Sequence, residues 1–159
     1  MTELHRILST GAVVLWMLPL LLSASLAIAA EGTPPGPELR YYQSKGGDFT
    51  LTSHTGKAVG LEDYRGQVVL LNFGYSSCPD ICPATLATLR ATLGLLGERA
   101  TAVQPLFVTV DPERDSLEKL AGYMGYFGPS FVGLRGDADQ TQRVAKQYRI
   151  RYAKRETGS

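Results

Sequence analysis

The sequence predicts an α/β fold with a parallel sheet, and three observations carry this prediction. Residues 67–75 form a nearly continuous apolar run that is typical of a central strand buried on both faces. A leucine pattern of helical spacing follows, and a second apolar run covers residues 103–110. A strand, a helix and a second strand in this order join parallel neighbours in a sheet.

The elements on either side of this unit have their own signals. Residues 49–61 place turn formers between two short apolar segments, which predicts a small β-hairpin. The helix after the first long strand ends near Gly97 and carries an apolar face formed by Leu86, Leu89, Leu93 and Leu96.

Two more helices and a short strand are predicted in the second half of the chain. Ser116 can cap a helix with the apolar stripe Leu117, Leu120, Ala121, Met124 and Phe127. Residues 131–134 suit a short strand. Asp137 or Asp139 begins the last helix, which bears Val144, Ala145 and Tyr148.

Composition excludes several classes of protein. The chain has 159 residues, with 16 Lys and Arg against 15 Asp and Glu, so its net charge of +1 gives no sign of a nucleic-acid partner. Two cysteines are too few for a disulfide-dense scaffold or for a four-cysteine zinc site.

The first thirty residues read as a segment for export. No charged residue lies between Arg6 and Glu31, and Ala27-Ile28-Ala29 has the form that signal peptidase cleaves. The stretch from Gly11 to Ala30 is also roughly 30 Å long as a helix, which is enough to span a bilayer. We therefore expect residues 1–30 to be a signal peptide or an N-terminal membrane anchor, with everything after Glu31 outside the cytoplasm.

A linker and one domain are expected after this leader. Residues 31–37 hold three prolines and two glycines, so residues 31–47 are expected to form an extended linker. Residues 48–159 are then the folded domain.

The two cysteines lie where an open α/β sheet places its sites. Cys78 and Cys82 follow the first long strand and precede the helix, and Pro83 suits the first helical turn. The helix N-terminus favours thiolate over thiol. Two thiolates can hold Cu(I), or they can form a disulfide and exchange it with a partner; an inert disulfide or two buried small apolar side chains are the structural alternatives.

The residues around the cysteines resemble those of the Sco (SenC) family. The resemblance rests on residues 73–83, FGYSSCPDICP, and on residues 108–115, VTVDPERD, at the expected distance. It implies a thioredoxin-like fold and a role in copper delivery and thiol redox chemistry during maturation of cytochrome c oxidase. By the same resemblance, Cys78 and Cys82 are the copper-ligating cysteines, and the DPERD segment, otherwise an ordinary turn, borders the copper site or the partner surface.

The resemblance also implies a location and partners. It places the domain on the periplasmic side of the bacterial inner membrane, anchored or secreted, or less readily in the mitochondrial intermembrane space. The expected partners are the copper-binding subunit of cytochrome c oxidase, other copper chaperones and thioredoxin-like reductants.

One family feature has no counterpart in the chain. Members supply a third copper ligand, a histidine in a later Asp-His motif, whereas the only histidines here are His5, in the leader, and His54, in a predicted exposed turn. Binding of Cu(II) is therefore doubtful. We expect the fold to be incomplete at the C-terminus, without the final β-hairpin and helix, which would leave residues 68–75 as an apolar edge.

Three functions follow from these observations. The first is a metallochaperone that binds Cu(I) through the C-x3-C pair. The second is a thiol-disulfide oxidoreductase in which Cys78 and Cys82 are the catalytic residues, and the third is a non-functional truncated fragment.

Overall fold

The computed structural model describes residues 45–153. The predicted leader (1–30) and all but the last three residues of the predicted linker (31–47) lie outside the described residues, as do residues 154–159. Within residues 45–153, no helix combines the length and the apolar character needed to cross a bilayer.

A five-stranded mixed sheet with the order β2-β1-β5-β4-β3 forms the centre of the fold. The strands are β1 (Thr50–Ser53), β2 (Ala58–Gly60), β3 (Val68–Gly74), β4 (Val103–Thr109) and β5 (Val132–Arg135). β3, β4 and β5 run parallel, and Leu71 of β3 lies opposite Leu106 of β4. The hairpin strand β1 joins the sheet antiparallel to β5.

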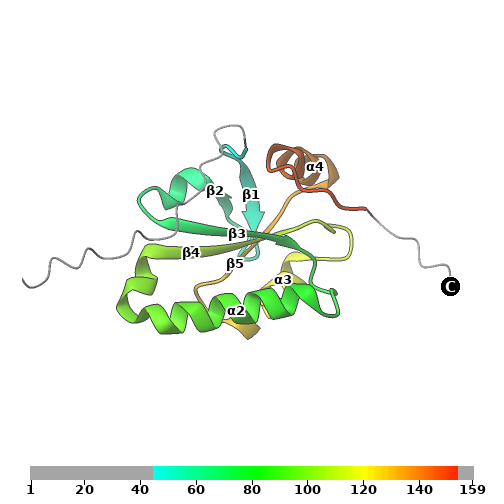
Figure 1. Ribbon diagram of the computed structural model, residues 1–159. Coiled ribbons are helices and arrows are strands. Elements are labelled where there is room, and N and C mark those ends of the chain that lie inside the picture. The colour runs from blue at the N-terminus through cyan, green and yellow to red at the C-terminus, as the bar shows by residue number, and fades with distance from the viewer. Residues whose placement is uncertain (1–44, 154–159) are drawn as a thin grey trace, which may run out of the picture. The chain divides into compact units, whose positions relative to one another are not determined.

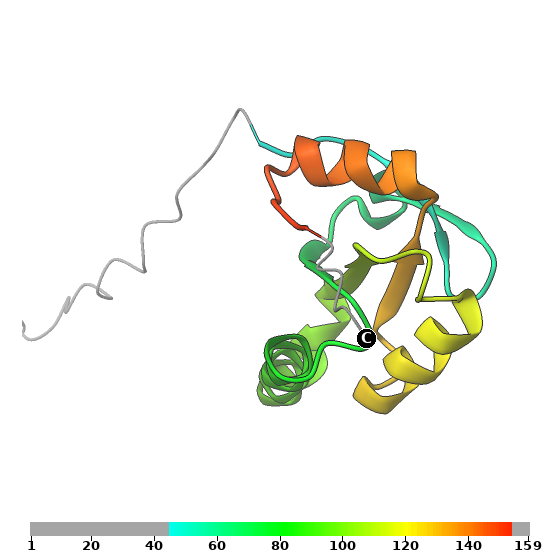
Figure 2. The same cartoon turned by 90° about the vertical axis from the view of Figure 1, so that its right-hand side faces the viewer.

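Helices cover both faces of the sheet. They are α2 (Ile81–Leu96), α3 (Leu117–Phe127) and α4 (Ala138–Gln147), with two 3-10 helices, η1 (Leu61–Tyr64) and η2 (Gly97–Ala102), between strands. α2 and α3 lie on one side of the sheet and α4 lies on the other, as Figure 1 and Figure 2 show from two directions. The predicted strand–helix–strand unit is confirmed as β3, α2 and β4.

The helix starts follow the predicted capping residues. The Ser116 hydroxyl accepts a hydrogen bond from the Lys119 N–H at 3.1 Å and begins α3. Asp137, rather than Asp139, begins α4: its carboxylate accepts from the Gln140 N–H at 2.7 Å, and the Gln140 amide oxygen accepts from the Asp137 N–H at 2.9 Å. These bonds satisfy N–H groups that a helix start leaves unpaired.

Alternate residues of β4 fill two apolar cores. Phe107 packs with residues of α2 and α3, which include Leu86 and Leu120, on one face of the sheet. Leu106 and Val108 pack on the other face with Val144 of α4. The leucine face predicted for α2 therefore lies in the first core, with Leu86 and Leu93 buried and Leu89 and Leu96 half-buried.

The prediction that residues 67–75 form a central strand buried on both faces is wrong. β3 is the last strand of the sheet, and among the described residues only β4 pairs with it, which agrees with the expectation of an apolar edge at residues 68–75. Val68 is 59% exposed, and the residues from Val69 to Phe73 are half-buried. The neighbouring strand β4 is paired on both sides, with β3 and with β5.

Candidate functional site

The two cysteines lie on the connection between the sheet edge and α2. β3 ends at Gly74, and the Cys78 N–H closes a turn by donating to the Tyr75 carbonyl oxygen at 3.1 Å. α2 begins at Ile81 after the cap Asp80, so Cys82 and Pro83 are its second and third residues. Pro83 therefore lies in the first helical turn, as predicted, where its missing N–H costs no hydrogen bond.

The C-terminal end of β3 comes very close to Cys82. A Cβ atom added to Gly74 would lie 2.8 Å from the Cys82 Sγ and 2.9 Å from the Phe107 ring. The sulfur and the ring thus share the space directly above the Gly74 backbone. Glycine is required at this position because the Cys82 side chain at the start of α2 packs directly against the backbone of β3.

The two thiols differ in exposure and in acidity. Both are free thiols; Cys78 is half-buried and Cys82 is 8% exposed. Burial raises the pKa of Cys78, but hydrogen bonds from the backbone of Asp80 and Cys82 and from the side chains of Cys82 and Tyr75 outweigh it and bring this pKa below its ordinary value. Burial raises the pKa of Cys82 above its ordinary value. The helix N-terminus therefore favours the thiolate at Cys78 only.

Tyr75 lies next to the more acidic sulfur. The negative charge of Cys78 raises the pKa of the Tyr75 phenol, as do burial and a hydrogen bond between the two side chains. On the other side, the guanidinium carbon of Arg114 lies 5.8 Å from the centre of the Tyr75 ring. Tyr75 thus connects the cysteine pair to the DPERD segment.

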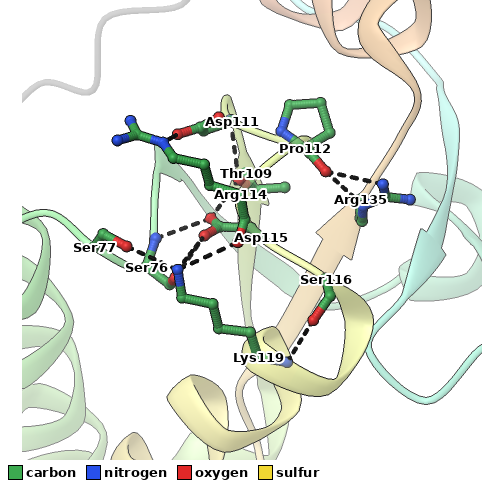
Figure 3. A network of polar contacts seen from close by, with 10 residues as sticks. All are labelled: Ser76, Ser77, Thr109, Asp111, Pro112, Arg114, Asp115, Ser116, Lys119 and Arg135. Atoms are coloured by element: carbon green, nitrogen blue, oxygen red, sulfur yellow. Dashed lines mark hydrogen bonds and ion pairs between the residues drawn. The ribbon is translucent and has the colours of Figure 1, made fainter. Parts of the chain in front are cut away.

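The Asp115 carboxylate fixes the loop that precedes Cys78 in the chain, through the contacts with Ser76 that Figure 3 shows. It is 1% exposed and accepts hydrogen bonds from the Ser76 N–H at 2.9 Å and from the Ser76 hydroxyl at 2.5 Å. The Thr109 hydroxyl donates a third bond at 2.6 Å, and the Lys119 ammonium lies 3.6 Å away. A buried carboxylate with this many partners is satisfied, and it holds the Ser76 backbone in one position.

Other contacts in Figure 3 hold the DPERD segment itself. The Lys119 ammonium donates to the Ser77 hydroxyl at 2.8 Å and to the Arg114 carbonyl oxygen at 3.2 Å. Arg114 forms an ion pair with Asp111. The Arg135 guanidinium donates twice to the Pro112 carbonyl oxygen, at 3.0 and 2.9 Å. These contacts hold the segment in place beside the loop that carries Cys78; that it borders a copper site or a partner surface stays a prediction.

The role of Asp115 could not be found from the sequence. The residue types at positions 111–115 predict an ordinary turn. Asp115 also lies 39 residues after Ser76 in the chain, so no local pattern links the two. The available signal was the resemblance of the DPERD segment to a family motif, which indicates proximity to the site without saying which atoms meet.

His54 is a structural residue in the hairpin turn. Its Nδ1 accepts a hydrogen bond from the Gly133 N–H at 3.0 Å, and the backbone N–H of His54 donates to the Gly133 carbonyl oxygen at 2.7 Å. The prediction of an exposed turn residue without a partner is wrong, because the turn folds back onto the start of β5. Across residues 45–153, no cluster of three or more His, Cys, Asp or Glu side chains is placed to hold a metal ion.

Comparisons with known proteins agree with the motifs. The family model for SCO1/SenC matches residues 37–159. This chain belongs to the SCO1/SenC family. Bovine "Protein SCO2 homolog, mitochondrial" is 45% identical over 109 residues, which cover 67% of this chain and 41% of that protein. The matched region thus spans about two fifths of that relative's length.

Two solved Sco structures have the same fold. Arabidopsis thaliana ScoI with copper bound has a TM-score of 0.67 and 37% identity, over 71% of this chain and 71% of that one. Yeast Sco1 with copper bound has a TM-score of 0.67 and 36% identity, over 73% of this chain and 65% of that one. The predicted thioredoxin-like α/β fold is confirmed, and copper, the predicted cofactor of this SCO1/SenC domain, is bound in both relatives.

Proposed function

We propose that this protein is a copper metallochaperone in which reduced Cys78 and Cys82 hold Cu(I). The single observation that carries the proposal is the pair of free thiols on a fixed loop at the end of β3, in a chain whose solved relatives hold copper. Two soft sulfur donors suit Cu(I), which accepts a low coordination number, whereas zinc requires about four ligands.

The copper-binding subunit of cytochrome c oxidase is the proposed recipient, because the family resemblance implies this partner. Cu(I) would pass from the cysteine pair to the thiolates of that subunit by exchange of sulfur ligands. Cys78 is the more exposed sulfur, so it is the side of the pair from which an incoming thiolate can approach. Other copper chaperones or thioredoxin-like reductants would load the pair or keep it reduced.

The organisation of the full chain is part of the same proposal. Residues 1–30 would act as a signal peptide or membrane anchor, residues 31–47 as a linker and residues 48–159 as the domain. The cysteine pair would then work on the periplasmic side of the inner membrane, in an oxidising compartment. Cell fractionation of the full chain, with and without residues 1–30, tests this location.

Copper stoichiometry of the purified full chain tests the metallochaperone. The reduced protein should retain one Cu(I) against a modest chelator, and Cys78→Ser and Cys82→Ser should each lose it. His54→Ala serves as the matched control. It removes an imidazole, a side chain that often binds metals, but the Nδ1 of His54 already accepts a hydrogen bond from the Gly133 N–H. Unchanged copper content in either cysteine variant would refute the proposal.

A thiol-disulfide oxidoreductase is the second candidate, and the asymmetry of the two thiols favours it. The Cys78 thiolate would attack a partner disulfide and form a mixed disulfide, releasing one partner thiolate. Cys82 would then attack the Cys78 sulfur and release the second partner thiolate, so that the partner gains two electrons and this protein becomes the disulfide. Cys82→Ser should accumulate the mixed disulfide, and Cys78→Ser should not.

A further inference from the structure

Tyr123 of α3 carries a buried hydroxyl that lacks a hydrogen-bond partner within residues 45–153. An unsatisfied buried polar group typically costs about 1–3 kcal/mol of stability. Such groups are rare in native proteins, and a functional role is one reason for keeping them. A phenylalanine here would preserve the ring and avoid the cost.

The ring of Tyr123 packs against two other aromatic rings of the core below α2 and α3. It makes edge contacts with Phe107, at 5.6 Å between ring centres, and with Phe127, at 5.1 Å. The Phe107 ring and the Cys82 sulfur both flank Gly74, at 2.9 Å and 2.8 Å from the position that a Cβ atom would take there. Phe107 therefore contacts Tyr123 on one side and lies close to the Cys82 sulfur at the end of β3.

The phenol lies within electrostatic range of both sulfurs. Burial raises the pKa of Tyr123 to about 12, and the negative charges of Cys82, Cys78 and Asp115 add to this effect in that order. The phenol consequently stays protonated at neutral pH and can act only as a neutral donor or acceptor.

We propose that Tyr123 is a positioning residue whose hydroxyl donates a hydrogen bond to the Cys82 sulfur when copper binds. The inference rests on the proposed copper function. Metal binding removes the thiol proton, and the resulting thiolate is a stronger acceptor than the thiol. The bond would use the donor that the copper-free protein leaves unpaired, and it would orient the Cys82 sulfur toward the metal, as supporting hydrogen bonds do at other metal sites.

Tyr123→Phe in the full chain separates this role from a purely structural one. The copper-free, reduced variant should keep or slightly raise its melting temperature, because the substitution removes an unsatisfied hydroxyl. Its affinity for Cu(I), measured by competition with a chromophoric Cu(I) chelator, should fall by roughly 10–100-fold. Tyr126→Phe is the matched control: it lies on the same helix with its side chain 76% exposed, and it should bind Cu(I) as the wild type does.

The outcomes distinguish the two proposals. If the wild type binds Cu(I) and Tyr123→Phe binds it equally well, the inference about Tyr123 is wrong and the metallochaperone stands. If the variant loses melting temperature and keeps its copper affinity, Tyr123 is only structural. If the wild type binds no more Cu(I) than the double variant Cys78→Ser, Cys82→Ser, the proposed function itself fails. A wild-type tyrosine absorbance spectrum that changes when Cu(I) is added, with the change absent in Tyr123→Phe, would support the bond independently of affinity.

Discussion

Asp115 and Ser76 join two motifs of the chain through two hydrogen bonds to one buried carboxylate. The Ser76 N–H donates at 2.9 Å and the Ser76 hydroxyl donates at 2.5 Å. Ser76 lies two residues before Cys78, and Asp115 closes the DPERD segment. The position of the first sulfur therefore depends on a residue that follows the neighbouring strand β4.

Replacing Asp115 should destabilise the domain and loosen the cysteine loop. Asp115→Ala leaves the Ser76 and Thr109 donors without their acceptor, so we expect the free energy of unfolding to fall by about 2–4 kcal/mol. Asp115→Asn, which keeps one acceptor oxygen, should lose less. Urea denaturation measures both, with the exposed Glu118→Gln as the control. A loss for Asp115→Ala no larger than that of the control would contradict this role.

Cys78 should react with alkylating reagents before Cys82. Its pKa lies below the ordinary value of 9.0 and that of Cys82 lies above it, so at neutral pH Cys78 supplies most of the thiolate. The rate of iodoacetamide labelling of Cys82→Ser should level off at a lower pH than that of Cys78→Ser. Equal profiles for the two single-cysteine variants would be inconsistent with the asymmetry.

The same shift has a defined sign for stability. Because the folded pKa of Cys78 is lowered, its thiolate stabilises the fold above the unfolded value of 9.0, and this contribution is lost as the pH falls through the folded pKa. Cys82 acts in the opposite direction, since its raised pKa disfavours the folded state once the pH exceeds 9.0. Melting temperatures of the two single-cysteine variants, followed across this range, should therefore diverge.

Gly74→Ala should disturb Cys82 directly. The added Cβ would lie 2.8 Å from the sulfur and 2.9 Å from the Phe107 ring, and overpacking of this kind costs about 1–3 kcal/mol. Copper affinity should fall together with stability. Gly94→Ala, at an exposed position of α2 where nothing lies within 4 Å of the new Cβ, should instead leave copper binding unchanged and stabilise the helix.

The exposed edge of β3 should promote self-association. Residues 68–74 carry no charge, and Val68 is 59% exposed at a strand edge that no described residue pairs. Val68→Lys should reduce light scattering at high protein concentration, because a charge on an edge strand discourages further pairing. Leu95→Lys is the control: it adds the same charge at an 88% exposed position on α2, away from the edge of the sheet. If both variants reduce scattering alike, net charge rather than the edge is responsible.

Local pattern alone determined much of this protein. The periodicity of the leucines predicted α2, Ser116 predicted the start of α3, and Asp137 was one of the two residues predicted to begin α4. These features succeed because caps, turns and helical faces depend on neighbours a few residues away. The resemblance carried by residues 73–83 and 108–115 added the family.

Tertiary structure decided what sequence pattern could not. An apolar run looks the same whether its strand lies at the centre or at the edge of a sheet, so the run of residues 67–75 was read as a central strand, and only the family resemblance led us to expect an edge there. Burial made the two cysteines unlike each other, although both lie near the same helix N-terminus. The acceptor for Ser76, the partner of His54 and the unpaired hydroxyl of Tyr123 each depend on which distant segments meet, and that is settled only when the layers pack together.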